Sequence, residues 1–359
     1  MLSNLPLFFP LLLAGTFIFS LVINSILLKF SRTLGIRNNP EIQIRWSPSV
    51  KPALGGITFY LVFLIAFLMS AFIIKQPESS FSNIKSISLI CALTLAFILG
   101  LADDAFDTKP LLKFSGQVIC ALILLLGGIK INCFQSEFIN HALTVLWIVA
   151  IMNSFNMLDN MDAIATIAAL SCFIFFVVAD YLQTGNITAS SIISFSILGS
   201  LCAFLHFNWN PSKMFMGDTG SQFLGALLGV NGILYCWNFK PFVENSIAAF
   251  PLVNCTLIAL VFILPLADTS TVFINRILKG NSPFIGGKDH TTHHLFFMGL
   301  SEKAVAFIFL FIGLISAAIS IALIRYSNGF SNNCFIFLLF PITVFASLFI
   351  FTRLKKRDK

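Results

Sequence analysis

The sequence is poor in charged residues and has no closely spaced cysteines. Only 10% of its 359 residues are charged and 57% are hydrophobic, whereas soluble domains carry about 25% charged residues. This composition excludes an ordinary soluble protein. The 8 cysteines include no CxxC pair, so neither a disulfide framework nor a zinc site is indicated. Because no linker, low-complexity tract or repeat divides the chain, we expect residues 1–359 to form a single integral membrane domain.

Long apolar runs predict an all-α, polytopic membrane protein with about 10–11 transmembrane helices, because a spanning helix needs roughly 20 mainly apolar residues. The fifth run is unusually short, which leaves the count open. The predicted spans lie near residues 8–28, 55–74, 87–102, 114–128, 142–152, 163–182, 188–206, 219–238, 247–268, 304–324 and 333–352.

The basic residues predict the orientation of these spans. Most of the 22 Lys and Arg residues fall in alternate loops that share one side with the C-terminus, and such loops are cytoplasmic. We therefore expect the C-terminus inside and the N-terminus outside. The basic residues follow the topology and form no patch or stripe, so a nucleic-acid partner is not expected.

Four short polar segments follow or precede apolar runs, and all four fall on the predicted cytoplasmic side. Carboxylates gathered beside a bilayer in this way indicate a divalent metal and a phosphate-rich substrate at one membrane face. In chain order, the segments are residues 100–107, 153–162, 215–221 and 286–294.

Paired aspartates, Asp103 and Asp104, end the third predicted span, and Asp107 follows. In a continuing helix Asp104 and Asp107 share a face, while Asp103 points about 100° from Asp104. Adjacent carboxylates repel one another unless a cation relieves them or one is protonated. A metal-assisted site is one interpretation, and an interfacial acid pair that serves Lys109 and Lys113 is an equal alternative.

Amide and carboxylate side chains recur every three residues at Asn153, Asn156, Asp159 and Asp162. A helical stretch would line them along one stripe, suited to a nucleobase, a sugar hydroxyl or a hydrated metal. The alternative is a polar helix start with Asn or Asp as its cap, which four such residues within ten make the weaker interpretation.

The third segment places Asp218 between glycines at the start of a predicted span. Glycines let backbone approach a ligand closely, and a helix N-terminus offers free N–H groups to anions. Asp218 could therefore bind a metal while neighbouring amides face a phosphate. Alternatively, Asp218 caps its own helix and the glycines only pack helices together.

The fourth segment carries His290 and His294 at i and i+4, with His293 between them and Lys288 nearby. On a helix this spacing gives a partly basic face that could bind diphosphate or a soft metal. The alternative is a set of solvated loop histidines.

Taken in order, these motifs resemble those of the polyprenyl-phosphate N-acetylhexosamine-1-phosphate transferases. These glycosyltransferase family 4-like membrane enzymes start bacterial cell-envelope glycans. Many members have glycine where Asn160 and Ala163 stand, and arginine where Lys288 and His294 stand. Lysine keeps the charge of arginine but loses its fork geometry. The resemblance extends over about residues 51–301 and rests on Lys51 to Gly56, Asp103-Asp104, Asn156 to Asp162, Phe215 to Ser221 and Gly286 to His294.

The resemblance implies an enzyme of the undecaprenyl-phosphate GlcNAc-1-phosphate transferase type. Such an enzyme transfers N-acetylhexosamine 1-phosphate from a UDP-sugar to a polyprenyl phosphate and releases UMP, the first membrane step towards a cell-wall, lipopolysaccharide or other polysaccharide. It implies Mg²⁺, with Mn²⁺ as the alternative, and a cytoplasmic active site in the bacterial inner membrane. A homodimer is left open.

The resemblance also implies which residues form the site. Asp103, Asp104 and Asp218 would be catalytic, with Asp218 and Asp104 as metal ligands. The implied substrate-binding residues are Lys51, Lys113, Asn156, Asp159, Asp162, Lys288, His290, His293 and His294.

The main alternative from another class is a membrane transporter for a nucleotide-linked or lipid-linked sugar. Coupled transporters bind substrate near the membrane midplane and often carry ionisable groups there. Asp180, His206 and Asp268 all lie near the ends of predicted spans. The sequence therefore favours the enzyme.

Overall fold

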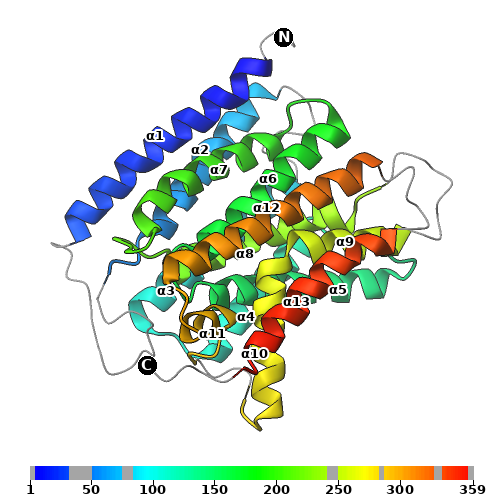
Figure 1. Cartoon of the computed structure of the whole chain (residues 1–359). Coiled ribbons are helices and arrows are strands. Elements are labelled where there is room, and N and C mark those ends of the chain that lie inside the picture. Colours follow the sequence, from blue (N-terminus) through cyan, green and yellow to red (C-terminus); the bar gives the residue numbers. More distant parts are fainter. Residues whose placement is uncertain are drawn as a thin grey trace.

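The protein is helical throughout the part of the chain that the computed structural model describes, which comprises residues 5–31, 51–74, 84–240, 250–282, 287–326 and 334–354 (Figure 1). Within these ranges the one extended pairing is an isolated bridge between Ala53 and Phe215. The predicted all-α fold is confirmed. The elements are α1 (Leu5–Ser31), α2 (Gly55–Ile73), α3 (Ile84–Phe106), α4 (Pro110–Leu126), α5 (Glu137–Leu158), α6 (Ile164–Thr184), α7 (Ala189–Asn208), α8 (Gly217–Gly232), the π-helix η3 (Ile233–Trp237), α9 (Phe250–Val261), α10 (Ile263–Leu278), α11 (Thr291–Phe297), α12 (Glu302–Tyr326), the 3₁₀ helix η4 (Cys334–Leu338) and α13 (Leu339–Phe351).

Seven helices in the described ranges are long and apolar enough to cross a membrane, namely α1, α2, α3, α5, α6, α7 and α12. The bent pair α9 and α10 brings the number to at most eight, and α4 and the η4–α13 pair are shorter apolar helices. These features make the chain a multi-pass membrane protein. Each of the eleven predicted spans has a helical counterpart.

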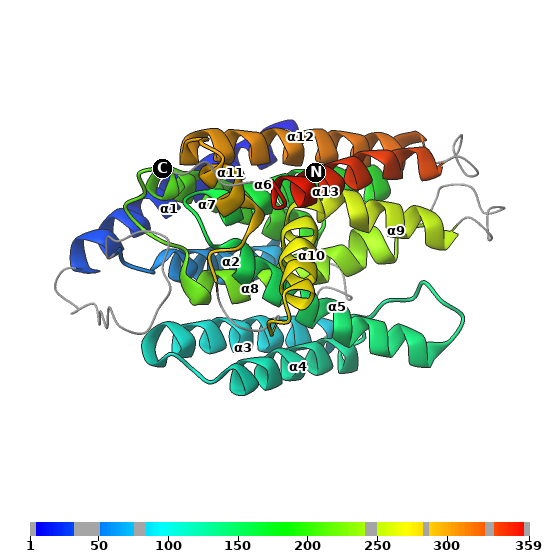
Figure 2. The ribbon, with the colours of Figure 1, turned by 60° about the horizontal axis from the view of Figure 1, so that its bottom comes forward.

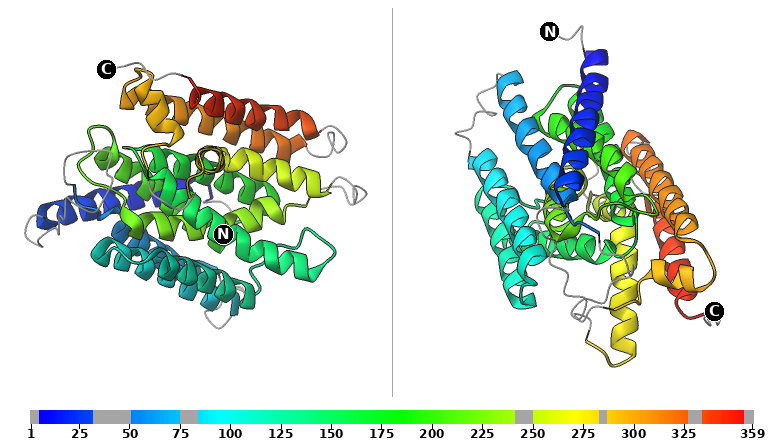
Figure 3. Two further views of the ribbon diagram at one scale, coloured as in Figure 1. Left: turned by 90° about the horizontal axis from the view of Figure 1, so that it is seen from below. Right: turned by 90° about the vertical axis from the view of Figure 1, so that its left-hand side faces the viewer.

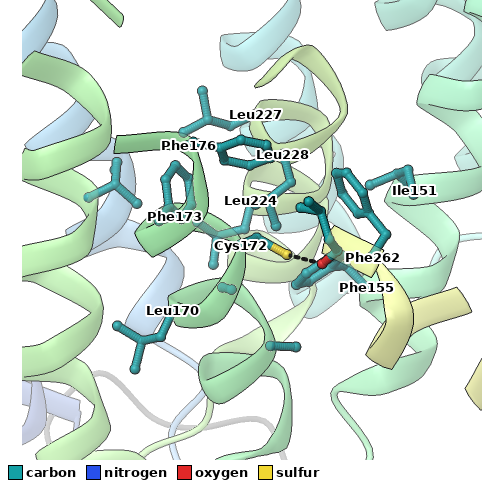
Figure 4. Packing of buried hydrophobic residues seen from close by; sticks show 14 of the residues in the cluster. Ile151, Phe155, Leu170, Cys172, Phe173, Phe176, Leu224, Leu227, Leu228 and Phe262 are labelled. Carbon is teal, nitrogen blue, oxygen red and sulfur yellow. Dashed lines mark hydrogen bonds between the residues drawn. The ribbon is translucent and has the colours of Figure 1, made fainter. Parts of the chain in front are cut away.

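Two spans differ from their predicted form. The fifth, α5, has 22 residues, because it begins earlier, after the Ser136 cap, and continues through Asn153 and Asn156, which bond to neighbouring helices. The ninth is broken, with an angle of 85° between α9 and α10. Pro265 has no N–H to donate to the carbonyl four residues earlier. That carbonyl, of Val261, instead accepts a hydrogen bond of 3.1 Å from Cys172 Sγ, the dashed line in Figure 4.

The helices pack in layers along one bundle. The pair α3 and α4 lies on one side and the pair α12 and α13 on the other, with α8 and α6 between them (Figures 2 and 3). Helix α1 covers α7 and α2 at another edge. Helix α8 contacts α2, α3 and α5, so its first residues lie where several helix ends meet.

The centre of the bundle is an aromatic and aliphatic core. Figure 4 shows α6, α5 and α8 meeting there, with Phe173 and Phe176 of α6 close to Leu224 of α8. Phe155 and Phe262, also drawn there, are fully buried. A helix that is apolar on all sides is expected to be enclosed by others, and α6 is the most enclosed of the candidate spans. This core fixes the helices whose ends carry the polar segments.

Candidate active site

Close backbone contacts fix the start of α8 against α2 and α3. A side chain at Gly100 would overlap the backbone of Asp218 and Thr219, and one at Gly56 would overlap the backbone of Gly220. Small residues permit such close approach of helices in membranes. The first and third polar segments therefore lie in direct contact.

Two predicted catalytic carboxylates lie on either side of a lysine. Lys113 Nζ donates to Asp103 Oδ2 at 2.6 Å and lies 3.5 Å from Asp218 Oδ1. Thr108 also donates to Asp103, from its backbone amide at 2.9 Å and from its hydroxyl. Two carboxylates share one ammonium group, and a further cation would relieve the repulsion between them.

Asp104 caps α8 from a different helix. Its Oδ1 accepts a hydrogen bond of 2.9 Å from the Asp218 amide. Its Oδ2 accepts bonds of 2.9 Å and 2.6 Å from the amide and hydroxyl of Thr219. The carboxylate thus satisfies amides that a helix N-terminus leaves unpaired. Asp218 does not cap its own helix, and the metal-ligand role of Asp104 stays a prediction.

The second polar segment joins this group through Asn156. Its Nδ2 donates to Asp218 Oδ1 and, at 2.9 Å, to Ser221 Oγ. Its Oδ1 accepts a bond of 3.0 Å from Lys113 Nζ. Side chains from α3, α4, α5 and α8 therefore form one connected cluster of Asp103, Lys113, Asn156 and Asp218, which we call the central cluster.

The predicted polar stripe ends with α5 at Leu158, so Asp159 and Asp162 lie in the turn before α6. Asp159 is partly exposed, and its carboxylate has no hydrogen-bond partner among the described residues. Burial, followed by the charges of Asp104 and Asp162, raises the pKa of Asp159 to about 7. This carboxylate is therefore available to a ligand.

Asp162 holds the loop that leads into α8. It accepts bonds of 3.0 Å and 2.7 Å from the amide and hydroxyl of Ser212, and one of 3.1 Å from Asn210 Nδ2. Lys51 Nζ lies 3.6 Å from Asp162 and donates to Ser212 Oγ at 2.9 Å. Asp162 and Lys51 thus lie together, and their substrate-binding roles stay predictions.

The fourth polar segment docks on α10 through Asp268. This fully buried carboxylate lies 2.8 Å from His290 Nδ1 and accepts bonds of 2.8 Å and 2.6 Å from the amide and hydroxyl of Thr291. A carboxylate at Nδ1 fixes the orientation of an imidazole. The sequence shows Asp268 only as an acid near the end of a span, so its partnership with His290 was missed.

His293 and Thr292 connect this segment to the second one. Thr292 Oγ1 donates to Asn160 Oδ1 at 2.6 Å, and His293 Nε2 lies 3.4 Å from the Asn160 carbonyl. Burial and the neighbouring His290 lower the pKa of His293 to about 4. His293 is therefore neutral at pH 7, and the basic face predicted for these histidines is not fully charged.

The remaining predicted residues of this segment lie further out. Lys288 is exposed, and the ring of His294 lies edge-on to Phe297 at 6.4 Å. Arg276 donates two hydrogen bonds of 2.7 Å to Asp289, a pairing that sequence reasoning missed. Although burial alone would raise the pKa of Asp289, its bonds to Arg276 lower that pKa. This ion pair anchors the segment beside α10.

The side chains gathered at the site show what kind of metal binding is possible there. Among the described residues, no three or more His, Cys, Asp and Glu side chains are arranged to hold an ion. Mg²⁺, however, is usually held by one or two carboxylates together with substrate phosphates and water. The partly exposed carboxylate of Asp218 is a ligand of that kind.

The chain resembles a family and several named enzymes. Residues 86–236, which contain the central cluster, match glycosyl transferase family 4. A probable undecaprenyl-phosphate N-acetylglucosaminyl 1-phosphate transferase of Bacillus subtilis (strain 168) is 26% identical over 337 residues, which are 91% of this chain and 87% of that protein. A decaprenyl-phosphate N-acetylglucosaminephosphotransferase of Mycolicibacterium smegmatis is 28% identical, over 74% of this chain and 70% of that one. A phospho-N-acetylmuramoyl-pentapeptide-transferase of Listeria monocytogenes serovar 1/2a is 28% identical, over 77% and 84%. The matched segment and these relatives support the family that the sequence motifs resemble.

Proposed function

We propose that this protein transfers N-acetylhexosamine 1-phosphate from a UDP-sugar to a polyprenyl phosphate and releases UMP. The central cluster carries the proposal, since it gathers two carboxylates, a lysine and an amide from four helices at one end of a membrane bundle. The B. subtilis and M. smegmatis relatives, by their names, transfer an N-acetylglucosamine phosphate to undecaprenyl and decaprenyl phosphate. We therefore favour UDP-GlcNAc and undecaprenyl phosphate as substrates.

The reaction exchanges one phosphorus–oxygen bond for another. An oxygen of the lipid phosphate attacks the β-phosphorus of the UDP-sugar. The bond from that phosphorus to the bridging oxygen breaks, and UMP leaves with the electron pair. Phosphoryl transfer depends almost entirely on positioning and on stabilising the transferred charge, which is what a cluster of fixed charges can supply.

Each charged member of the cluster has a place in this reaction. Asp218 would hold Mg²⁺ together with the substrate phosphates. The ion would neutralise charge on the diphosphate. Lys113, 2.6 Å from Asp103, would hold the lipid phosphate beside Asp103, which orients its attacking oxygen. Asp104 would act through its cap on α8, which places Asp218.

The surrounding residues would bind the donor. The carboxylate of Asp159, which has no hydrogen-bond partner within the described ranges, suits a hydroxyl or amide of the nucleotide. His290, oriented by Asp268, would contact the diphosphate or the sugar, and the neutral ring of His293 would act as a hydrogen-bonding group. We place this end of the bundle at the cytoplasmic face of the bacterial inner membrane, because the basic residues concentrate in the loops on that side.

The test is an assay of the purified protein in lipid nanodiscs with Mg²⁺, undecaprenyl phosphate and UDP-GlcNAc. We expect UMP and a lipid-diphosphate-sugar, and we expect Asp218→Ala and Asp103→Asn to abolish both. Asp107→Asn is the matched control, because Asp107 is an exposed acid at the same helix end with a φ of 52° that asparagine tolerates. Normal turnover in the Asp218 and Asp103 variants would remove the site assignment. A panel of other UDP-sugars in the same assay identifies the preferred donor.

A further inference from the structure

A second layer of polar side chains lies one helical turn from the central cluster. It consists of Gln117, Asn153 and Gln222, one each from α4, α5 and α8. Gln117 follows Lys113 by four residues and Gln222 follows Asp218 by four, while Asn153 precedes Asn156 by three. This spacing puts each carboxamide on the same helix face as its partner in the cluster. We call these three residues the carboxamide layer.

The carboxamide layer is bonded across three helices. Gln117 Nε2 donates to Asn153 Oδ1 at 3.2 Å and to Gln222 Oε1 at 3.0 Å. Asn153 Nδ2 donates to Gln117 Oε1 at 2.7 Å and to the Val149 carbonyl at 2.9 Å. Both glutamines are fully buried. The layer therefore ties the helix of Lys113 to those of Asn156 and Asp218.

Stability alone does not account for the carboxamide layer. Buried amides lose their hydration, and Gln222 Nε2 is a buried donor without a partner in the described part of the chain. Such a donor is destabilising, whereas apolar side chains of similar volume would fill the same space without it. Sequences break local rules of this kind mainly at functional sites. Carboxamides are also neutral, so they add no charge to the cluster above.

We propose that Gln117, Asn153 and Gln222 are positioning residues for the phosphosugar transfer, and this rests on the proposed function. The Gln117–Gln222 bond sets the separation and rotation of α4 against α8. It thereby keeps Lys113 between Asp103 and Asp218. Misplacing a catalytic group by about 1 Å can reduce the rate about 100-fold, so a link one turn away has a large effect on turnover.

The test compares Gln117→Met and Gln222→Met with the wild type, each in the full-length protein. Methionine keeps the length of glutamine but makes none of these hydrogen bonds. We expect each variant to lower kcat about 10-fold to 100-fold and to leave KM for the UDP-sugar within about threefold. The thermal midpoint should fall, because the buried partner groups lose their hydrogen bonds, so turnover is measured well below the midpoint of each variant. Leu124→Met, at another fully buried position of α4, is the matched control and should keep full activity.

The double variant separates positioning from general damage. Since Gln117→Met already breaks the Gln117–Gln222 bond, Gln117→Met/Gln222→Met should lose no more activity than Gln117→Met alone. If the activity losses of the two single variants instead multiply in the double variant and run parallel to its thermal midpoint, the carboxamide layer has a merely structural role. An unchanged kcat in both single variants of an active enzyme would overturn the inference.

An inactive wild type would instead defeat the proposed function. In that event a cryo-EM structure of Gln117→Met tests whether the carboxamide layer positions Lys113. The inference expects Lys113 to move away from Asp103, and a Lys113 that stays in place would overturn it.

Discussion

Asp104 offers the sharpest single perturbation, because the sequence predicts a metal ligand and the structure places a helix cap. Its carboxylate accepts three hydrogen bonds from the first residues of α8. In Asp104→Asn one oxygen becomes an NH₂ group, which must face an amide or hydroxyl that now lacks an acceptor. Hydrogen bonds to a charged group contribute about 1.5–3 kcal/mol each, and a helix cap about 0.5–2 kcal/mol. We therefore expect a loss of about 2 kcal/mol in the free energy of unfolding.

Stability and activity should fall together in this variant, because the start of α8 carries Asp218. Thr219→Val is the graded control. It removes one of the three bonds and should lose about 1 kcal/mol, with a smaller loss of turnover. The assays are thermal unfolding in nanodiscs and UMP release as a function of Mg²⁺ concentration.

The opposite outcome would refute the cap as the main role of Asp104. If Asp104→Asn kept the wild-type thermal midpoint but needed far more Mg²⁺ for half-maximal turnover, Asp104 would be a direct ligand. The interpretation from the sequence would then stand, and the bonds to α8 would be secondary.

Three further outcomes follow from the same contacts. Asp268→Asn should lower kcat about 10-fold to 100-fold, the usual effect of removing a partner that orients a functional histidine; wild-type turnover would exclude His290 from the site. The pKa of His293 lies near 4, below its ordinary value of about 6.5, so the unfolded chain takes up this proton first and His293 lowers stability as pH drops from 6.5 to 4. Asp159, with its pKa raised to about 7, contributes with the opposite sign in this window. His293→Gln should therefore lose less stability than the wild type between these pH values in thermal unfolding, and an identical pH dependence in the two proteins would exclude His293 as its source. Removal of divalent ions with EDTA should stop UMP release and added Mg²⁺ or Mn²⁺ should restore it, whereas full activity in EDTA would exclude the ion.

The fold was largely predictable, because membrane helices are recognised by apolar length alone. The two exceptions have physical causes outside that rule. Helix α5 continues through Asn153 and Asn156 because other helices satisfy their amides. The break at Phe262 combines Pro265 with a thiol from α6 that bonds to the Val261 carbonyl, and such a distant partner leaves no mark in the local sequence.

The sequence was enough to predict which residues form the site, but not which of them contact one another. Asp103, Asn156 and Asp218 were found as polar residues at the ends of apolar runs, and they lie in one cluster. The cap on α8 from Asp104 and the contact of Asp268 with His290 join residues far apart in the chain. Periodicity within one helix carries no information about such pairs.

The destination of the donor's β-phosphorus tests the central claim most directly. The wild-type protein is incubated with Mg²⁺, undecaprenyl phosphate and UDP-GlcNAc labelled with ³²P at the β-phosphate. If the central cluster transfers a phosphosugar, the label appears in the lipid and UMP is released unlabelled. Label recovered in free UDP would show that only the sugar is transferred, and label that stays in intact UDP-GlcNAc would show no transfer; either result would contradict the account.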